Sequence, residues 1–150
     1  MASRNQTAYF YPLAQGPIAQ VEFAATDVED VEIRMHWVNP EDHTVDFLVE
    51  WRHTTGILKR GRWFSEYDVQ TARPKLVYGY WDRRGGRCVT TKLNKYHVFG
   101  IVDECGKNYY VQWTGYDEDE ATWETKAKVK RICPRAVLDW QYCKKSKLSN

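Results

Sequence analysis

The sequence lacks a long apolar run and any obvious targeting segment. None of its apolar stretches approaches the roughly 18 to 20 residues that a membrane helix needs. The N-terminus has neither the charged start nor the apolar core of a signal peptide. We therefore expect a soluble, non-secreted protein that makes no contact with a membrane.

Cysteine is scarce, and the sequence contains no recognisable catalytic or metal-binding motif. No two of the four cysteines form a CxxC pair, and none stands at a zinc-ligand spacing from a histidine. They are Cys88, Cys105, Cys133 and Cys143. The chain also has no glycine-rich phosphate loop and no nucleophile elbow. We predict free thiols, no metal, no cofactor and no catalytic residue, and hence a protein that is not an enzyme.

Neither sign of charge dominates. The 22 Lys and Arg face 20 Asp and Glu, so the net charge of +2 does not demand a nucleic-acid partner. Of the 150 residues, 43% are apolar and 15% are aromatic, which is enough to build a core. This composition predicts one mid-sized domain or two very small ones.

An internal repeat favours two small modules. The segment from Asp46 to Trp51 lies 62 positions before the similar segment from Asn108 to Trp113. From Trp63 and Trp123 onward the offset is a constant 60, through two prolines and the apolar residues that follow them. The order and bulk of these matches predict a duplication.

Each copy shows the same sequence of predicted elements. Alternating apolar positions indicate strands, and a proline suits the first position of a closing helix. The predicted strands are 31–38, 45–52 and 62–64 in the first copy and 96–103, 108–114 and 121–124 in the second, with helices from Pro74 to about Arg83 and from Pro134. We predict an α+β fold of two modules, each a curled three-stranded antiparallel sheet packed against a C-terminal helix.

The repeat also divides the chain. We expect an N-terminal extension at 1–27, a first module at 28–84, a basic and flexible linker at 85–94, and a second module at 95–145. The extension contains Tyr9, Phe10 and Tyr11, which would dock either on the first module or on a partner.

Three aromatic residues of the second copy form a candidate site. Tyr96 opens the first strand, Trp113 ends the second, and Tyr116 follows in the next turn. The start of one strand lies beside the end of its antiparallel neighbour, so the three rings can converge. Three ring faces around a small volume suit a quaternary ammonium group such as methylated lysine. The alternative is that Trp113 is an ordinary core residue.

Residues 95–143 resemble a chromodomain. The resemblance rests on Tyr96 and Val98, on the Trp-x-Gly-Tyr motif that begins at Trp113, on Thr122-Trp123-Glu124, and on the Cys-Pro before the final helix. It implies that the three rings bind a methylated lysine of a histone tail, with Val98 lining a pocket of the peptide groove and Glu120 beside the cage. It also implies a nuclear protein of chromatin.

Two lysines depart from the family pattern. Counting without gaps from Trp123 places Lys128 and Lys130 on the strand that would clasp the other side of the peptide. Heterochromatin-type members commonly carry Asn and an acidic residue there. Cations facing a basic tail would weaken binding, unless both lysines project into solvent.

The first copy matches less closely and has lost the cage. It keeps Trp51, but Val31 and Thr54 occupy the other two positions. Its last helix resembles that of a chromo shadow domain, a dimerising and peptide-binding relative. Val77, Tyr80 and Trp81 on this helix would therefore form either core or a surface for self-association or a peptide partner.

Nucleic-acid binding is the alternative function. Residues 1–90 carry a net charge of −1 and residues 91–150 carry +3. The cations concentrate in the linker, at 126–131 and in the tail at 144–147. These groups could make weak phosphate contacts, so a tether that ignores methylation stays open beside the methyl-lysine reader.

Overall fold

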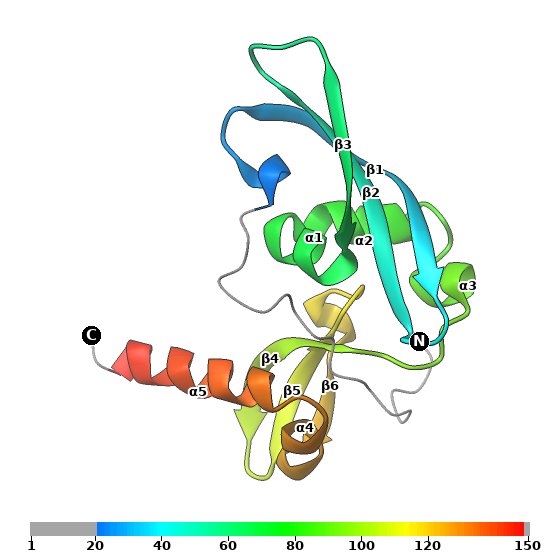
Figure 1. Cartoon of the computed structure of the whole chain (residues 1–150). Helices are drawn as coiled ribbons and strands as arrows, with labels where there is room; N and C mark the ends of the chain where they lie inside the picture. The colour runs from blue at the N-terminus through cyan, green and yellow to red at the C-terminus, as the bar shows by residue number, and fades with distance from the viewer. Residues whose placement is uncertain (1–20, 149–150) are drawn as a thin grey trace. The chain divides into compact units, whose positions relative to one another are not determined.

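The computed structural model describes residues 21–148. Among these, the residues up to Leu93 form one compact unit and those from Asn94 form another. Figure 1 labels the helices and strands of both. Tyr9, Phe10 and Tyr11 lie outside the described residues. No helix within the described range is long and apolar enough to span a membrane.

The first unit is a three-stranded antiparallel sheet followed by helices. The sheet order is β1-β2-β3, so β2 is central. The elements are η1 (Glu22–Ala24), β1 (Val28–Asn39), β2 (Thr44–His53), β3 (Lys59–Ser65), α1 (Glu66–Ala72), α2 (Pro74–Asp82) and α3 (Arg87–Thr91).

The second unit has the same order of strands and two helices after them. Its sheet order is β4-β5-β6, so β4 and β6 are edge strands. The elements are β4 (Val98–Cys105), β5 (Asn108–Trp113), η2 (Glu118–Glu120), β6 (Thr122–Thr125), α4 (Lys126–Ile132) and α5 (Pro134–Leu148). The predicted α+β fold of two sheet-and-helix modules is confirmed.

Each unit contains one helix more than predicted between its last strand and the helix that starts at proline. Ser65 accepts a hydrogen bond from the Asp68 backbone N–H, and Thr125 accepts one from the Lys128 backbone N–H. Such N-caps satisfy amide groups that the first turn of a helix leaves without partners. Helices α1 and α4 therefore begin at equivalent caps, 60 residues apart.

Each unit has its own apolar core under its sheet. In the first, Phe47 and Val49 of β2 and Val69 of α1 are completely buried. In the second, Val111 of β5 and Val129 of α4 take the same part. The core positions on the central strands alternate, as expected for a sheet that is covered on one face.

The first core corrects two predictions. Val77, Tyr80 and Trp81 are all buried in it, so of the two alternatives for this helix face the core is correct and the interaction surface is wrong. Phe23 is also fully buried in this core. The first module therefore begins before residue 28, because Phe23 of η1 packs against Trp51 and Phe64 of the strands.

The predicted linker is another correction. Residues 87–91 of the 85–94 segment form α3, and Arg87 is buried there. Its guanidinium donates to both carboxylate oxygens of Glu66 on α1, at 2.8–3.1 Å. A buried carboxylate needs such a partner, so this basic residue packs into the first unit and does not belong to a flexible connection.

Candidate functional site

Three aromatic rings converge in the second unit. The ring centroids of Tyr96 and Trp113 are 6.4 Å apart, and those of Tyr96 and Tyr116 are 5.9 Å apart. The ring planes meet at 61° and 72°, which are edge-on arrangements. Residue Tyr96 precedes β4, Trp113 ends β5, and Tyr116 lies in the following turn. The sequence therefore anticipated the grouping of these rings.

The turn after β5 is held by backbone and side-chain hydrogen bonds. The Thr114 N–H donates to the carbonyl of His97 at 2.8 Å, and the Tyr116 N–H donates to that of Trp113 at 3.0 Å. Gly115 has a φ of 92°, a conformation that other residues rarely adopt. The Trp-x-Gly-Tyr motif thus has a structural reason: the glycine allows the turn that returns Tyr116 to the other rings.

Trp113 is oriented by a chain of polar contacts that sequence reasoning did not identify. Its Nε1–H donates to Thr122 Oγ1 at 2.9 Å, and the Thr122 hydroxyl donates to Glu124 Oε2 at 2.8 Å. The other oxygen of Glu124 accepts from Lys128 Nζ at 2.6 Å. The Thr-Trp-Glu motif was the available signal, because two of its three residues fix the orientation of the tryptophan.

All three rings are nearly buried. Tyr96 is 2% exposed, Trp113 is 1% exposed and Tyr116 is 8% exposed. The ring faces are therefore covered in this conformation, and a cation reaches them only after a rearrangement. Thr114 in the turn after β5 has a buried hydroxyl with no hydrogen-bond partner among the described residues, so it can still bond to an incoming ligand.

The predicted groove residues are placed on different elements. Val98 pairs directly with Trp113 across the two strands and is buried, and Glu120 ends η2 beside the turn. Lys128 and Lys130 are not on a strand. They lie on α4, because the Thr125 cap starts a helix there. The clasping strand is therefore a wrong prediction, and the Lys128 charge is neutralised by Glu124.

A second polar cluster joins the helices of this unit to its sheet. Glu104 on β4 accepts hydrogen bonds from Lys126 Nζ at 2.6 Å, from Trp140 Nε1 at 2.8 Å and from Lys144 Nζ. These donors stabilise the carboxylate and lower the pKa of Glu104 to about 2. Two of the basic residues that could have bound phosphate are therefore engaged inside the unit.

The strand register shows which residues of the first unit match the rings. Ile33 pairs with Val49 as Ile101 pairs with Val111, so β1 and β4 correspond with an offset of 68 residues. Residue Val28 therefore matches Tyr96, which corrects the choice of Val31 made from the sequence. The offset is 68 for the first strands but 62 for the second strands, because the β1–β2 hairpin is six residues longer than the β4–β5 hairpin.

The first unit has no aromatic box at these positions. Trp51 matches Trp113, but its neighbours at the matching positions are Val28 and Thr54. Its ring instead packs against Phe23 of η1, with the centroids 6.2 Å apart, and against Phe64 at 6.1 Å. Aromatic side chains of the unit itself therefore surround this tryptophan.

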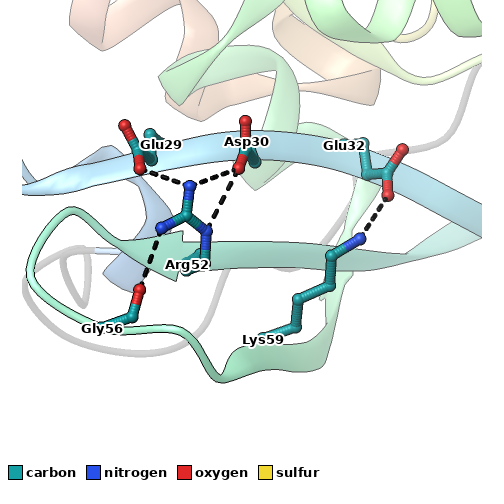
Figure 2. Close-up of polar contacts among 6 residues, drawn as sticks. All are labelled: Glu29, Asp30, Glu32, Arg52, Gly56 and Lys59. Atoms are coloured by element: carbon teal, nitrogen blue, oxygen red, sulfur yellow. Dashed lines mark hydrogen bonds and ion pairs between the residues drawn. The ribbon is translucent and has the colours of Figure 1, made fainter.

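Ion pairs close the same end of the first sheet. Figure 2 shows Arg52 of β2 between Glu29 and Asp30 of β1, at 2.5 and 2.8 Å. The same guanidinium donates to the carbonyl of Gly56 in the following loop at 2.9 Å. The backbone of β1 is thus tied to the β2–β3 loop, at the end of the sheet where the second unit has its rings.

Within the described residues there is no cluster of His, Cys, Asp and Glu that could hold a metal ion. The four cysteines are free thiols. Burial raises the pKa of the Cys133 thiol, which makes that side chain a poor nucleophile.

Comparison with known families gives a match over the second unit. The model of the Chromo (CHRromatin Organisation MOdifier) domain matches residues 92–142. This match spans the three rings, the sheet β4-β5-β6 and most of α5. Chromo domains are in general non-catalytic modules of chromatin proteins that read methylated lysine. No curated protein and no solved structure matches the chain.

Proposed function

We propose that the second unit binds a methylated lysine of a histone tail and that the protein acts on chromatin in the nucleus. The observation that carries the proposal is the convergence of Tyr96, Trp113 and Tyr116, with centroid distances of 5.9 and 6.4 Å. A methylated ammonium keeps its charge but loses hydration, so ring faces favour it over plain lysine. Each ring supplies about 0.5–2 kcal/mol.

The peptide backbone would supply the remaining affinity. β4 is an edge strand, and its outer side can accept another strand. Tyr96 stands just before β4, so a peptide that pairs along this edge places its lysine at the rings. Val98 and Glu120 would shape the groove for the neighbouring peptide side chains.

Acidic residues next to the rings suit a basic peptide. η2 carries Glu118, Asp119 and Glu120, and Asp117 caps it through its side chain. These carboxylates raise the local concentration of a positively charged tail and add a salt-dependent part to the association rate. Selectivity for methylation would still come from the rings.

The test is binding of the purified chain to an array of histone-tail peptides, unmodified and mono-, di- and trimethylated, at low and physiological salt. We expect preference for one methylated site that survives the higher salt. Trp113→Phe keeps an aromatic ring at this position and should retain measurable binding, whereas Tyr96→Ala and Tyr116→Ala should weaken it. Equal affinity for methylated and unmodified peptides would overturn the proposal.

Nucleic-acid binding is the second candidate, and the ion pairs argue against it as the main activity. Lys126, Lys128 and Lys144 all bond to carboxylates of the same unit. Lys130 and Arg131 on α4 are exposed cations that could contact phosphate. Binding that ignores methylation and falls steeply with salt would identify this tether function.

For the first unit we propose self-association through the outer face of its sheet. Met35 and Trp63 lie in one cross-strand row with Leu48 between them, and Trp37 lies two residues further along β1. Met35, Trp37 and Trp63 are about half exposed. Aromatic residues and Met are enriched at protein interfaces, and a second copy of the same face would cover them.

Sedimentation of the wild-type chain and of Trp63→Lys tests the self-association. We expect a dimer that the substitution shifts to monomer. Trp123→Lys is the matched control, because Trp123 occupies the same position in the second unit and is 49% exposed. A strictly monomeric wild-type chain at high concentration would overturn this role.

A further inference from the structure

The second unit has a cavity between its two helices that its fold does not fill. The cavity measures about 420 Å³ and is lined by residues of α4, α5 and the central strand. Its apolar wall includes Val137 and Leu138 of α5, and Leu138 is 62% exposed. Tyr109 of β5 also lines the cavity. The cavity is separate from the three-ring cage, since none of those rings lines it.

The equivalent place in the first unit is occupied by side chains of that unit. The constant offset of 60 matches Gln141 with Trp81 and Ala127 with Tyr67. Trp81 is 2% exposed and packs on Phe47, with the ring centroids 5.5 Å apart. The small Ala127 and the exposed Gln141 leave the corresponding volume open in the second unit.

In the first unit a charged pair lies beside the side chain of Trp81. Glu66, the first residue of α1, accepts from Trp81 Nε1 at 2.8 Å and from Arg87 of α3. Arg87 of α3 is thus a buried cation that pairs with a carboxylate of α1. In the second unit the residue that matches Glu66 is Lys126, and the residue that matches Arg87 is Lys147, still within α5.

The charge at the position of Glu66 is therefore reversed in the second unit, and Lys147, which matches the buried Arg87, is exposed. Lys126 and Lys130 both line the cavity. Although Lys126 bonds to Glu104, that carboxylate also serves Lys144, so the cluster retains excess positive charge. Lys145 stands one turn beyond Gln141 on the same face of α5. An apolar pocket with a basic rim suits an anionic partner that carries an apolar side chain.

We propose that the α4–α5 groove of the second unit binds an acidic peptide segment of a partner protein. One large apolar side chain of the peptide fills the cavity beside Ala127 and Val137, and flanking carboxylates pair with Lys126 and Lys130. The peptide side chain thus fills the volume that Trp81 fills in the first unit. Its carboxylates pair with lysines of the protein, whereas in the first unit the carboxylate of Glu66 pairs with Arg87. An apolar cavity favours a peptide over a phosphate backbone, which has no side chain to bury there.

The test uses fluorescence anisotropy with the full chain and two matched sets of labelled ten-residue peptides. One set has Glu and Asp around a central Trp, Phe, Leu or Gly, and the other has Gln and Asn around the same centres. We expect binding of acidic peptides with an apolar centre, and at least tenfold weaker binding when the centre is Gly or the acids are amides. If no acidic peptide with an apolar centre binds, the proposal is wrong.

Variants of the protein locate the binding. Gln141→Trp fills the groove as Trp81 does in the first unit, and Lys130→Glu reverses the rim charge, so each should reduce affinity at least tenfold. Lys107→Glu makes the same charge change at an exposed turn of the same unit and should leave affinity within twofold. Unchanged binding by Gln141→Trp would place the peptide elsewhere and overturn the proposal.

Binding to the groove is independent of the cage, and the two are distinguished in the same samples. Gln141→Trp should retain the circular dichroism spectrum and any methylated-peptide binding of the wild type, because it lines neither the rings nor the β4 edge. A Gln141→Trp chain that loses its fold would be replaced by Ala127→Leu, which fills the cavity from α4. Equal acidic-peptide binding by this second variant would also overturn the proposal.

Discussion

The two units attach their helices to their sheets at the same position but with opposite chemistry. In the first, His36 of β1 faces Tyr80 of α2, with 2.6 Å between Nδ1 and the hydroxyl oxygen, and Arg84 lies 3.5 Å over the Tyr80 ring. Burial, with a smaller effect of Arg84, lowers the pKa of His36. The neutral imidazole of His36 therefore shares a hydrogen bond with the Tyr80 hydroxyl, and the tautomer of the ring sets which of the two groups donates.

In the second unit the same position holds a full charge. Glu104 matches His36 by the strand register, and Trp140 and Lys144 match Tyr80 and Arg84 by the offset of 60. Glu104 collects three donors. Both units have a polar link between the first strand and the helix that begins at proline, and the two links differ in charge. The charge and size of matching side chains thus differ between the two units here, as they do at the three rings and at the α4–α5 groove.

The buried ion pair of the first unit should be the most sensitive difference between the two units. Glu66 and Arg87 have side chains 2% and 3% exposed, and Glu66→Gln leaves the guanidinium buried without its counter-charge. We expect a loss of about 3–5 kcal/mol in unfolding free energy, measured by urea denaturation with hydrogen exchange to assign the unit. Lys126→Gln is the control at the matching, partly exposed position, where the loss should be at most about 1 kcal/mol.

A double variant completes this test. Glu66→Met with Arg87→Met replaces the pair by apolar side chains of similar length, so it should recover most of the stability lost by Glu66→Gln. If Glu66→Gln alone were as stable as the wild type, the buried pair would contribute nothing to the first unit.

The residues that follow the two matched tryptophans differ as well: Tyr116 in the second unit corresponds to Thr54 in the first. Tyr116→Ala should weaken binding of the preferred methylated histone peptide about tenfold, which corresponds to roughly 1.4 kcal/mol. Thr54→Ala changes the matching residue of the first unit and should leave the affinity unchanged, because the positions that match Tyr96 and Tyr116 hold no aromatic residue there. Isothermal titration with methylated and unmodified peptides measures both. A loss of affinity in Thr54→Ala would mean that the first unit also reads the peptide.

The strands and the grouping of the three rings could be predicted from the sequence because their signals are local. Alternation and β-branched residues place β2 and β5, and proline at the first helical position places the starts of α2 and α5. The order of Tyr96, Trp113 and Tyr116 along two antiparallel strands was enough to bring their rings together. The fold class followed from the same signals.

The features that the sequence did not predict depend on tertiary contacts or on a competing local pattern. Lys126, Lys128 and Lys130 alternate as on a strand, but the Thr125 cap and buried Val129 favour a helix. Two glycines beside α3 suggested a flexible linker, whereas Arg87 is fixed by a carboxylate 21 residues earlier. The match between His36 and Glu104 follows only from the strand register, because the β1–β2 hairpin is six residues longer than the β4–β5 hairpin and the offset changes from 68 to 62 across it.

The two polar links should respond differently to acid. The pKa of His36 is lowered from 6.5, so the unfolded state takes up a proton before the folded state does, and the first unit should lose stability as the pH falls below about 6.5. The pKa of Glu104 is lowered from 4.5 to about 2. Its contribution to the second unit should be fully present above about pH 5 and disappear as the pH falls toward 2.

Hydrogen exchange followed by mass spectrometry from pH 7 to pH 3 separates these responses, after correction for the intrinsic exchange rate. First-unit amides should lose protection at the higher pH. Glu104→Gln should lower the protection of α5 at pH 6 and match the wild type near pH 2 in urea denaturation. His36→Gln should remove the loss of first-unit stability between pH 6.5 and 5. Identical acid profiles for the two units would contradict the contrast between a neutral and a charged link.

The smallest expected effect is at the caps that the two units share. Ser65 accepts from the Asp68 N–H at 3.1 Å and Thr125 from the Lys128 N–H at 3.2 Å, each before a helix of seven residues. Ser65→Ala and Thr125→Ala should each cost about 1 kcal/mol, with a difference between them close to zero. Urea denaturation with unit-resolved hydrogen exchange measures both losses. A clearly larger loss for one cap would show that its helix depends more on the cap than on burial of Val69 or Val129, which are equally and completely buried.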